Sequence, residues 1–327
     1  MEQMASSASA SNRAISDVSL TMIHTVSAEA ILIAGPTASG KSRAALELAQ
    51  AVGGVIINAD SMQVYREPRL LTARPSDADM SRAPHLLYGH VTADDAYSTG
   101  RYQSDAGHAL HEVRAAGRIP IFVGGTGLYF TALTQGLSEM PTIPAGVREM
   151  VKERRERVGA EAFHAELAAR DPVMAEELDV GDTQRTLRAM EVLDATGRSL
   201  SFWQQNAGKP VLDGLSLARF VIDVPRALLR ARIDARFRAM VAGGAMEEAL
   251  ALENLDPALP AAKIIGRREL LALHDGAMTE EEAIEKAVIA TGQYAKRQDT
   301  WFRNQLPDWS RVDGESHKIV AEMITLL

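Results

Sequence analysis

Residues 31–42, ILIAGPTASGKS, constrain the fold more than any other stretch of this 327-residue chain. An apolar run leads into a glycine-rich loop that ends in Lys41 and Ser42, and apolar residues at helical spacing follow from Ala44 to Val52. A strand before and a helix after are the context in which the pattern G-x-x-x-x-G-K-[ST] binds phosphate. The predicted phosphate-binding loop consists of Gly35, Pro36, Thr37, Ala38, Ser39, Gly40, Lys41 and Ser42.

The chemistry of this loop follows from its backbone. N–H groups at a helix N-terminus would cradle the phosphate oxygens, while Lys41 adds a positive charge and the Ser42 hydroxyl ligates Mg²⁺. Many nucleotide-binding proteins, including ATP-binding ones, share the pattern. The loop alone therefore predicts phosphate binding without saying which phosphate is bound.

The later apolar runs predict an α/β fold. GGVIINAD (53–60) and IPIFVGGTG (119–127) have the pattern of buried strands, and residues 96–118 between them that of a helix. LARFVIDV (217–224) predicts a further strand, and mostly helical sequence follows it to the end. Strands that alternate with helices indicate a parallel sheet covered on both faces. We therefore expect a P-loop NTPase-like core built on a parallel sheet.

A change of pattern predicts a helical insertion at 140–205, where charged amphipathic sequence shows no convincing strand. Residues 29–139 and 206–327 would then form the α/β core, with a helical C-terminal part. Residues 1–28 are rich in serine and alanine and predict a disordered extension. A targeting peptide and a translation start at Met22 are alternatives for this segment.

Composition excludes several classes of protein. With no cysteine, the chain has no disulfides, cysteine-ligated metals or cysteine nucleophiles. No run approaches the roughly 18 apolar residues that span a bilayer, so we expect no membrane association. The formal net charge of -8 means that a nucleic acid would have to meet local basic patches. We expect a monomer in the cytoplasm.

The acid nearest to the phosphate loop is Asp60, at the carboxyl end of the second predicted strand. Ligands bind at this edge of open parallel sheets, so its carboxylate would reach a substrate beside the loop. A solvated strand-end aspartate is the alternative. A kinase or NTP hydrolase would usually place a metal-binding acid after a further strand. The run at 119–127 ends in glycine and threonine instead, and Asp223 is the other candidate for that place.

Five stretches, taken together and in order, resemble the tRNA dimethylallyltransferase family. They are GPTASGKS, NADSMQVYREPRLLTARP, GRIPIFVGGTGLYFTALTQGLS, DTQRTLRAMEVLDATGRSLS and RARIDARF, and the likeness extends from about residue 30 to 304. The resemblance implies that the loop holds the pyrophosphate of dimethylallyl diphosphate. The prenyl group would go to N6 of the adenosine on the 3′ side of the anticodon. Eukaryotic members carry a C-terminal zinc finger, so this cysteine-free chain resembles the bacterial branch.

The resemblance also implies roles for single residues. Lys41 and Ser42 would hold the pyrophosphate and its Mg²⁺, and Asp60 would accept a proton from N6. Thr126 would lie beside the reacting centre, and Arg236 would reach the leaving diphosphate. Residues expected to contact the tRNA anticodon stem-loop are Asp60, Ser61, Met62, Gln63, Thr126, Arg148, Gln184, Arg185, Thr186, Leu187 and Arg188. The basic stretch IIGRRE adds Ile264, Ile265, Gly266, Arg267, Arg268 and Glu269.

Basic clusters fit an RNA substrate but leave alternatives open. Five cations between Arg148 and Arg157 alternate with glutamates, which is equally typical of a solvated, salt-bridged helix face. Tyr294, Trp301 and Phe302 lie among cations and would stack on bases or fill the core. Three other functions stay open: a prenyltransferase of free AMP, ADP or ATP, a P-loop kinase, and a non-catalytic RNA-binding protein.

Overall fold

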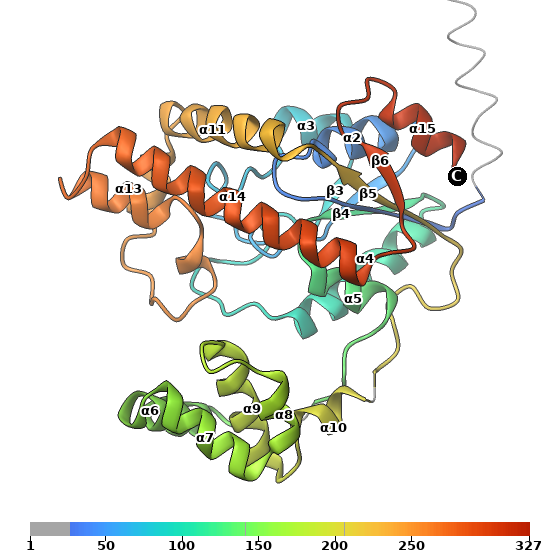
Figure 1. Cartoon of the computed structure of the whole chain (residues 1–327). Helices are drawn as coiled ribbons and strands as arrows, with labels where there is room; N and C mark the ends of the chain where they lie inside the picture. Colours follow the sequence, from blue (N-terminus) through green and yellow to red (C-terminus); the bar gives the residue numbers. More distant parts are fainter. Residues whose placement is uncertain (1–26, 141, 206) are drawn as a thin grey trace, which may run out of the picture. The chain divides into compact units, whose positions relative to one another are not determined.

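The structure is a computed structural model that describes residues 27–140, 142–205 and 207–327. It is built around one six-stranded parallel sheet (Figure 1). The strand order is β3-β2-β4-β1-β5-β6. The strands are β1 (Ala30–Ala34), β2 (Val55–Asn58), β3 (His85–Leu86), β4 (Pro120–Gly124), β5 (Leu217–Asp223) and β6 (Ser310–Asp313). The α/β fold class predicted from the sequence is confirmed.

Strands β1, β2 and β4 are buried along their whole length. One cluster of buried side chains contains Ile33 together with Leu48 of α2, and the other contains Leu32 together with Phe130 of α5. In Figure 1, α2 and α15 lie above the strands, and α4 and α5 below them. Burying one such side chain fully contributes about 1.5–3 kcal/mol. The sheet is therefore a firm base for the loops at its carboxyl edge.

The chain divides into two compact units, 1–133 with 211–327, and 134–210. The helices of the first unit are α2 (Lys41–Val52), α3 (Asp77–Arg82), α4 (Thr99–Ala115), α5 (Gly127–Thr134), α11 (Arg226–Ala242), α12 (Ala245–Ala251), η2 (Ala261–Lys263), α13 (Arg267–His274), α14 (Glu280–Gln305) and α15 (Ile319–Thr325). None of the helices in the described ranges is long and apolar enough to cross a membrane.

The second unit is made of α6 (Ala145–Val158), α7 (Ala160–Arg170), α8 (Pro172–Glu177), α9 (Thr183–Thr196) and α10 (Leu200–Gln204). Its own core includes Val151, Phe163 and Met190. This unit extends a few residues beyond the 140–205 range expected for the insertion, at both ends.

Three local features differ from the prediction. The edge strands β3 and β6 were missed, because two and four residues are too few to show a clear period. Part of the expected N-terminal extension belongs to the core, since the Ser27 amide donates to the Leu327 carbonyl at 3.1 Å and Ala28 is buried. The rest of that prediction, including Met22, lies outside the described residues.

Candidate active site

The candidate site lies where β2, β4 and β1, which are neighbours in the sheet, reach its carboxyl edge. The phosphate loop follows β1, Asp60 follows β2, and Thr126 follows β4. Parallel strands end on the same side, so the fold brings together three segments that are far apart in sequence.

The phosphate loop turns sharply to start α2. Ala38 and Gly40 have φ of 64° and 92°, a left-handed conformation that glycine adopts without steric cost. The Ser39 amide donates to the Pro36 carbonyl at 3.2 Å, which closes the turn. The first N–H groups of α2 then point out of the helix start, where an anion is favoured. The geometry is that of a phosphate-binding loop.

Lys41 is buried inside this loop, and its Nζ donates to the Pro36 carbonyl at 3.3 Å. Burial lowers the pKa of Lys41 from 10.5 to about 8. The negative charge of Asp60 opposes this fall, and the positive charge of Arg236 adds to it. A diphosphate beside the Lys41 ammonium would favour its charged form.

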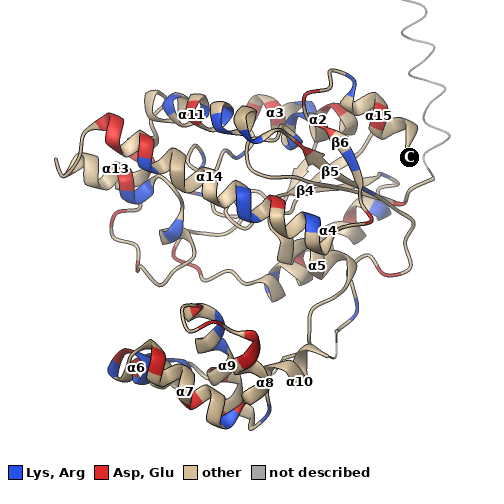
Figure 2. Cartoon of the chain, in the orientation of Figure 1, with Lys and Arg blue, Asp and Glu red and all other residues tan. Residues whose placement is uncertain are grey.

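Arginines of α11 reach the same loop. Arg236 donates to the Thr37 hydroxyl at 2.7 Å, and Arg232, one turn earlier, donates to the Ser39 carbonyl at 3.4 Å. Burial lowers the pKa of Arg236, and the charge of Asp60 opposes it. Figure 2 shows several blue segments, for Lys and Arg, along α11. The loop is therefore flanked by guanidinium groups as well as by Lys41.

Asp60 is held by a residue that the sequence analysis missed. The fully buried Asn58 side chain accepts the Asp60 N–H at 2.9 Å and donates to the Asp60 carbonyl at 2.9 Å. It also donates to the Leu87 carbonyl at 3.0 Å. Asp60 Oδ1 in turn accepts the Met62 amide at 2.9 Å. These bonds fix the backbone of Asp60 while its carboxylate stays partly exposed.

Thr126 meets the segment that follows Asp60. Its Oγ1 accepts the Ser61 amide at 2.8 Å and donates to the Ser61 hydroxyl at 3.2 Å. Close approach requires Gly124, because a Cβ there would lie 1.9 Å from the Ala59 carbonyl oxygen. The structure thus brings Lys41, Asp60, Thr126 and Arg236 to one sheet edge.

Three tyrosines lie within electrostatic range of Asp60: the buried Tyr129 and the partly buried Tyr88 and Tyr294. Burial raises the pKa of each phenol, and the charge of Asp60 raises it further. Their hydroxyls therefore stay protonated, and uncharged, near neutral pH. The sequence does not predict Tyr88 or Tyr129 as site residues, although Tyr129 stands within the GGTGLY stretch, whereas Tyr294 is one of the aromatic residues expected to stack on bases or to fill the core.

The predicted tRNA contacts in the first unit have mixed surroundings. Gln63 is buried and donates to the Thr72 and Ala73 carbonyls, so its amide is already used. Ile264 is buried, and Glu269 accepts the Gly266 amide as a helix cap.

Arg267 donates to the Leu252, Glu253 and Ala262 carbonyls and so ties down the end of α12. Arg268, in contrast, has a side chain that is 90% exposed. This segment therefore presents one arginine to solvent, while its neighbour is engaged inside the fold.

In the second unit, Arg148, Gln184 and Arg185 are exposed, whereas Thr186 is buried and bonded to the Asp182 carbonyl. Leu187 packs beside the core, and Arg188 pairs with Glu191 at 3.3 Å.

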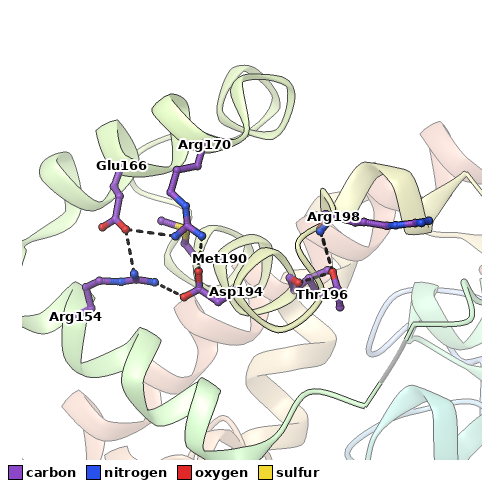
Figure 3. A network of polar contacts seen from close by, with 8 residues as sticks. Arg154, Glu166, Arg170, Met190, Asp194, Thr196 and Arg198 are labelled. Atoms are coloured by element: carbon purple, nitrogen blue, oxygen red, sulfur yellow. Dashed lines mark hydrogen bonds and ion pairs between the residues drawn. The ribbon is translucent and has the colours of Figure 1, made fainter.

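Arg154, one of the clustered cations, belongs to an internal network. It binds Glu166 and Asp194, and Arg170 binds the same two acids (Figure 3). Arg154 is therefore ion-paired, but with acids of α7 and α9 and not with the glutamates interleaved on a solvated face of its own helix.

Ser42 lies in the first turn of α2 and is exposed. The described residues contain no cluster of three or more His, Cys, Asp or Glu that would hold a metal by themselves. Mg²⁺ accepts a donor set of one protein oxygen, substrate phosphates and water. A serine hydroxyl at the phosphate loop therefore fits this ion. Asp223, the other candidate acid, accepts from Arg311 at 3.2 Å.

Comparison with known proteins identifies the family. The model of the family described as IPP transferase matches residues 63–305, more than half of the chain. The chain belongs to this family. A second model, described as isopentenyl transferase, matches residues 28–92. The resemblance to tRNA dimethylallyltransferases seen in the sequence is thereby confirmed.

Similar IPP transferases are known from sequence and from structure. The tRNA dimethylallyltransferase of Allorhizobium ampelinum is 51% identical over 293 residues, covering 89% of this chain and 96% of that protein. That of Nitrobacter hamburgensis is 53% identical over 284 residues, covering 86% and 90%.

Among solved structures, the tRNA isopentenylpyrophosphate transferase of Bacillus halodurans is 30% identical, with a TM-score of 0.64 and coverage of 90% and 94%. A eukaryotic dimethylallyltransferase acting on tRNA is 26% identical, with a TM-score of 0.72 and coverage of 87% and 73%. These likenesses confirm the P-loop NTPase-like core.

Proposed function

We propose that the chain transfers a dimethylallyl group from dimethylallyl diphosphate to N6 of the adenosine on the 3′ side of a tRNA anticodon. The observation that carries this proposal is a carboxylate, Asp60, at one sheet edge with two cations, the buried Lys41 and the partly buried Arg236. The names of the relatives support it, since they are tRNA dimethylallyltransferases.

The donor side of the site is the phosphate loop with its cations. As the bond between C1 of the prenyl group and the diphosphate oxygen breaks, its electron pair leaves with the diphosphate. Backbone amides, Lys41 and Arg236 are already aimed at that growing charge, and such preorganised stabilisation is usually the largest catalytic term. Mg²⁺, held by Ser42 and the diphosphate, would add further positive charge there.

The acceptor side is Asp60. The N6 lone pair of adenine is delocalised into the ring, which makes it a weak nucleophile. As the bond from N6 to C1 forms, the N6 proton moves to the Asp60 carboxylate, a contribution worth about 10²–10⁴-fold. Asn58 holds the backbone of Asp60 for this task, and Thr126 holds the next residue, Ser61.

The RNA must present an unstacked base, at a cost of a few kcal/mol. We place its contacts on the exposed predicted residues Arg148, Gln184, Arg185 and Arg268, and on the segment after Asp60. Residues 140–205 then serve as the tRNA-contacting insertion. All reacting groups come from a single chain, which supports a monomer, and tRNA as substrate supports a cytoplasmic location.

The test is substrate choice. Purified protein with Mg²⁺ and labelled dimethylallyl diphosphate should label unmodified tRNA and leave free AMP unlabelled. Label on AMP would instead assign the chain to the nucleotide-directed prenyltransferases. ATP consumption without any transfer would point to a kinase or hydrolase and overturn the proposal.

A further inference from the structure

Gln298 is a buried glutamine on α14 that neither the sequence motifs nor the proposed mechanism uses. It is 6% exposed and shares one helix face with the buried residues Ala295 and Phe302. Burying an amide without hydrogen bonds costs about 1–3 kcal/mol by mutational measures. A buried amide at this position therefore needs hydrogen-bond partners, and those partners indicate what the side chain does.

Both ends of the Gln298 amide are engaged, and each by a different loop of the site. Oε1 accepts the Thr37 amide of the phosphate loop at 2.9 Å. Nε2 donates to the Gly125 carbonyl, next to Thr126, at 2.7 Å. One side chain thus joins the loop that would hold the donor to the loop that leads to the acceptor side.

The chain is shaped to allow this contact. A Cβ on Gly125 would lie 2.2 Å from Gln298 Nε2, and a Cβ on Gly127 would lie 2.4 Å from the Trp301 ring. The two glycines let this loop approach α14 closely. The glycines after β4 therefore allow close packing against α14 in addition to forming the turn.

Neighbouring contacts lie on the same route. Tyr294, one turn before Gln298, lies close enough to Thr126 and Gln298 for both side chains to influence the pKa of its phenol. On the other side, the Thr37 hydroxyl accepts from Arg236. Gln298 therefore lies between the arginine expected at the leaving diphosphate and the threonine expected beside the reacting centre.

We propose that Gln298 is a positioning residue that fixes the distance between the diphosphate loop and the acceptor loop. The inference rests on the proposed function. Prenyl transfer needs donor and acceptor in line at short range, and misplacement by about 1 Å can cost on the order of 10²-fold in rate. Gln298 touches neither substrate and acts through Thr37 and Gly125.

The first test uses Gln298→Met, which keeps the length of the side chain and removes both hydrogen bonds. With enzyme in excess over an anticodon stem-loop and saturating dimethylallyl diphosphate, the single-turnover rate constant should fall about 10- to 100-fold. The amplitude should stay within about 20% of that of the unaltered protein, because the same fraction of molecules folds and binds. A lower amplitude with an unchanged rate constant would mean a structural role alone and overturn the proposal.

Two further variants sharpen the comparison. Gln298→Glu keeps an acceptor for the Thr37 amide but places an oxygen against the Gly125 carbonyl, so it should be slow as well. An unchanged rate constant in Gln298→Glu would contradict the proposal that Gln298 must bond to both loops. The matched control is Gln293→Met, an exposed glutamine of the same helix, which should leave the rate constant unchanged.

A second readout does not depend on catalysis. In Gln298→Met, amide hydrogen exchange should become faster in both 35–40 and 124–127, because the link between the loops is lost. Faster exchange in only one loop would overturn the proposal. If the unaltered protein transfers no label, the proposed function fails. The exchange experiment still tests whether Gln298 holds the two loops together.

Discussion

At the scale of single residues, the site is governed by burial. Lys41 is placed where water is scarce, so it loses part of its preference for the charged form. Asp60 is the opposite case: its backbone is fixed by the buried Asn58, and its carboxylate remains partly exposed to a substrate. A bound anion would therefore favour the charged form of Lys41, and the Asp60 carboxylate is accessible to a proton donor.

The lowered pKa of Lys41 predicts a pH dependence of donor binding. Lys41 in the free protein loses its proton as the pH rises through about 8, whereas the bound diphosphate favours the ammonium. Without Mg²⁺ and tRNA, affinity for dimethylallyl diphosphate should be highest below pH 8. It should then weaken by about tenfold per pH unit above pH 8, with proton uptake on binding.

Isothermal titration in buffers of different ionisation enthalpy measures this proton uptake. Lys41→Met should bind more weakly at every pH and lose the uptake between pH 8 and 9. Uptake that persists in this variant would mean that another group titrates.

At the scale of elements, glycines and polar anchors decide how closely the loops approach the sheet. Gly124 is required because any Cβ would collide with the carbonyl of Ala59. In the second unit, the ion network of Arg154, Glu166, Arg170 and Asp194 connects α6, α7 and α9 (Figure 3). Asp194 is only 15% exposed and accepts from both arginines, so it is the centre of the network.

Replacing Asp194 should therefore destabilise the second unit. Asp194→Ala leaves two partly buried guanidinium groups short of a partner, which should lower the free energy of unfolding by about 2 kcal/mol. Urea denaturation followed by circular dichroism measures this change. Glu153→Gln, on the exposed side of α6, is the control and should change stability by less than about 0.5 kcal/mol. Equal effects of the two changes would refute a special role for the network.

At the scale of the whole molecule, the sequence was most informative where a local pattern carries chemistry. The phosphate loop, the strand that precedes Asp60 and the glycine turn before Thr126 all have short signatures with a physical cause. Parallel topology then brings them together without further information.

What the sequence did not predict depends on contacts between distant segments. Gln298 is 261 residues from Thr37, and the one available signal was a glutamine on an otherwise apolar helix face. The sequence also did not predict that the Arg267 guanidinium donates to the Leu252 carbonyl just after α12; its contact with RNA stays a prediction. The short edge strands β3 and β6 are too brief for periodicity to reveal.

If Asp60 takes the proton from the RNA base as the prenyl group is transferred, Asp60→Asn should slow the transfer step itself. Asparagine keeps the size and the acceptor for the Met62 amide but is far too weak a base. The single-turnover rate of dimethylallyl transfer to an anticodon stem-loop should fall about 10²–10⁴-fold. Stem-loop affinity should stay within about threefold. Transfer by Asp60→Asn at the rate of the unaltered protein would contradict the account.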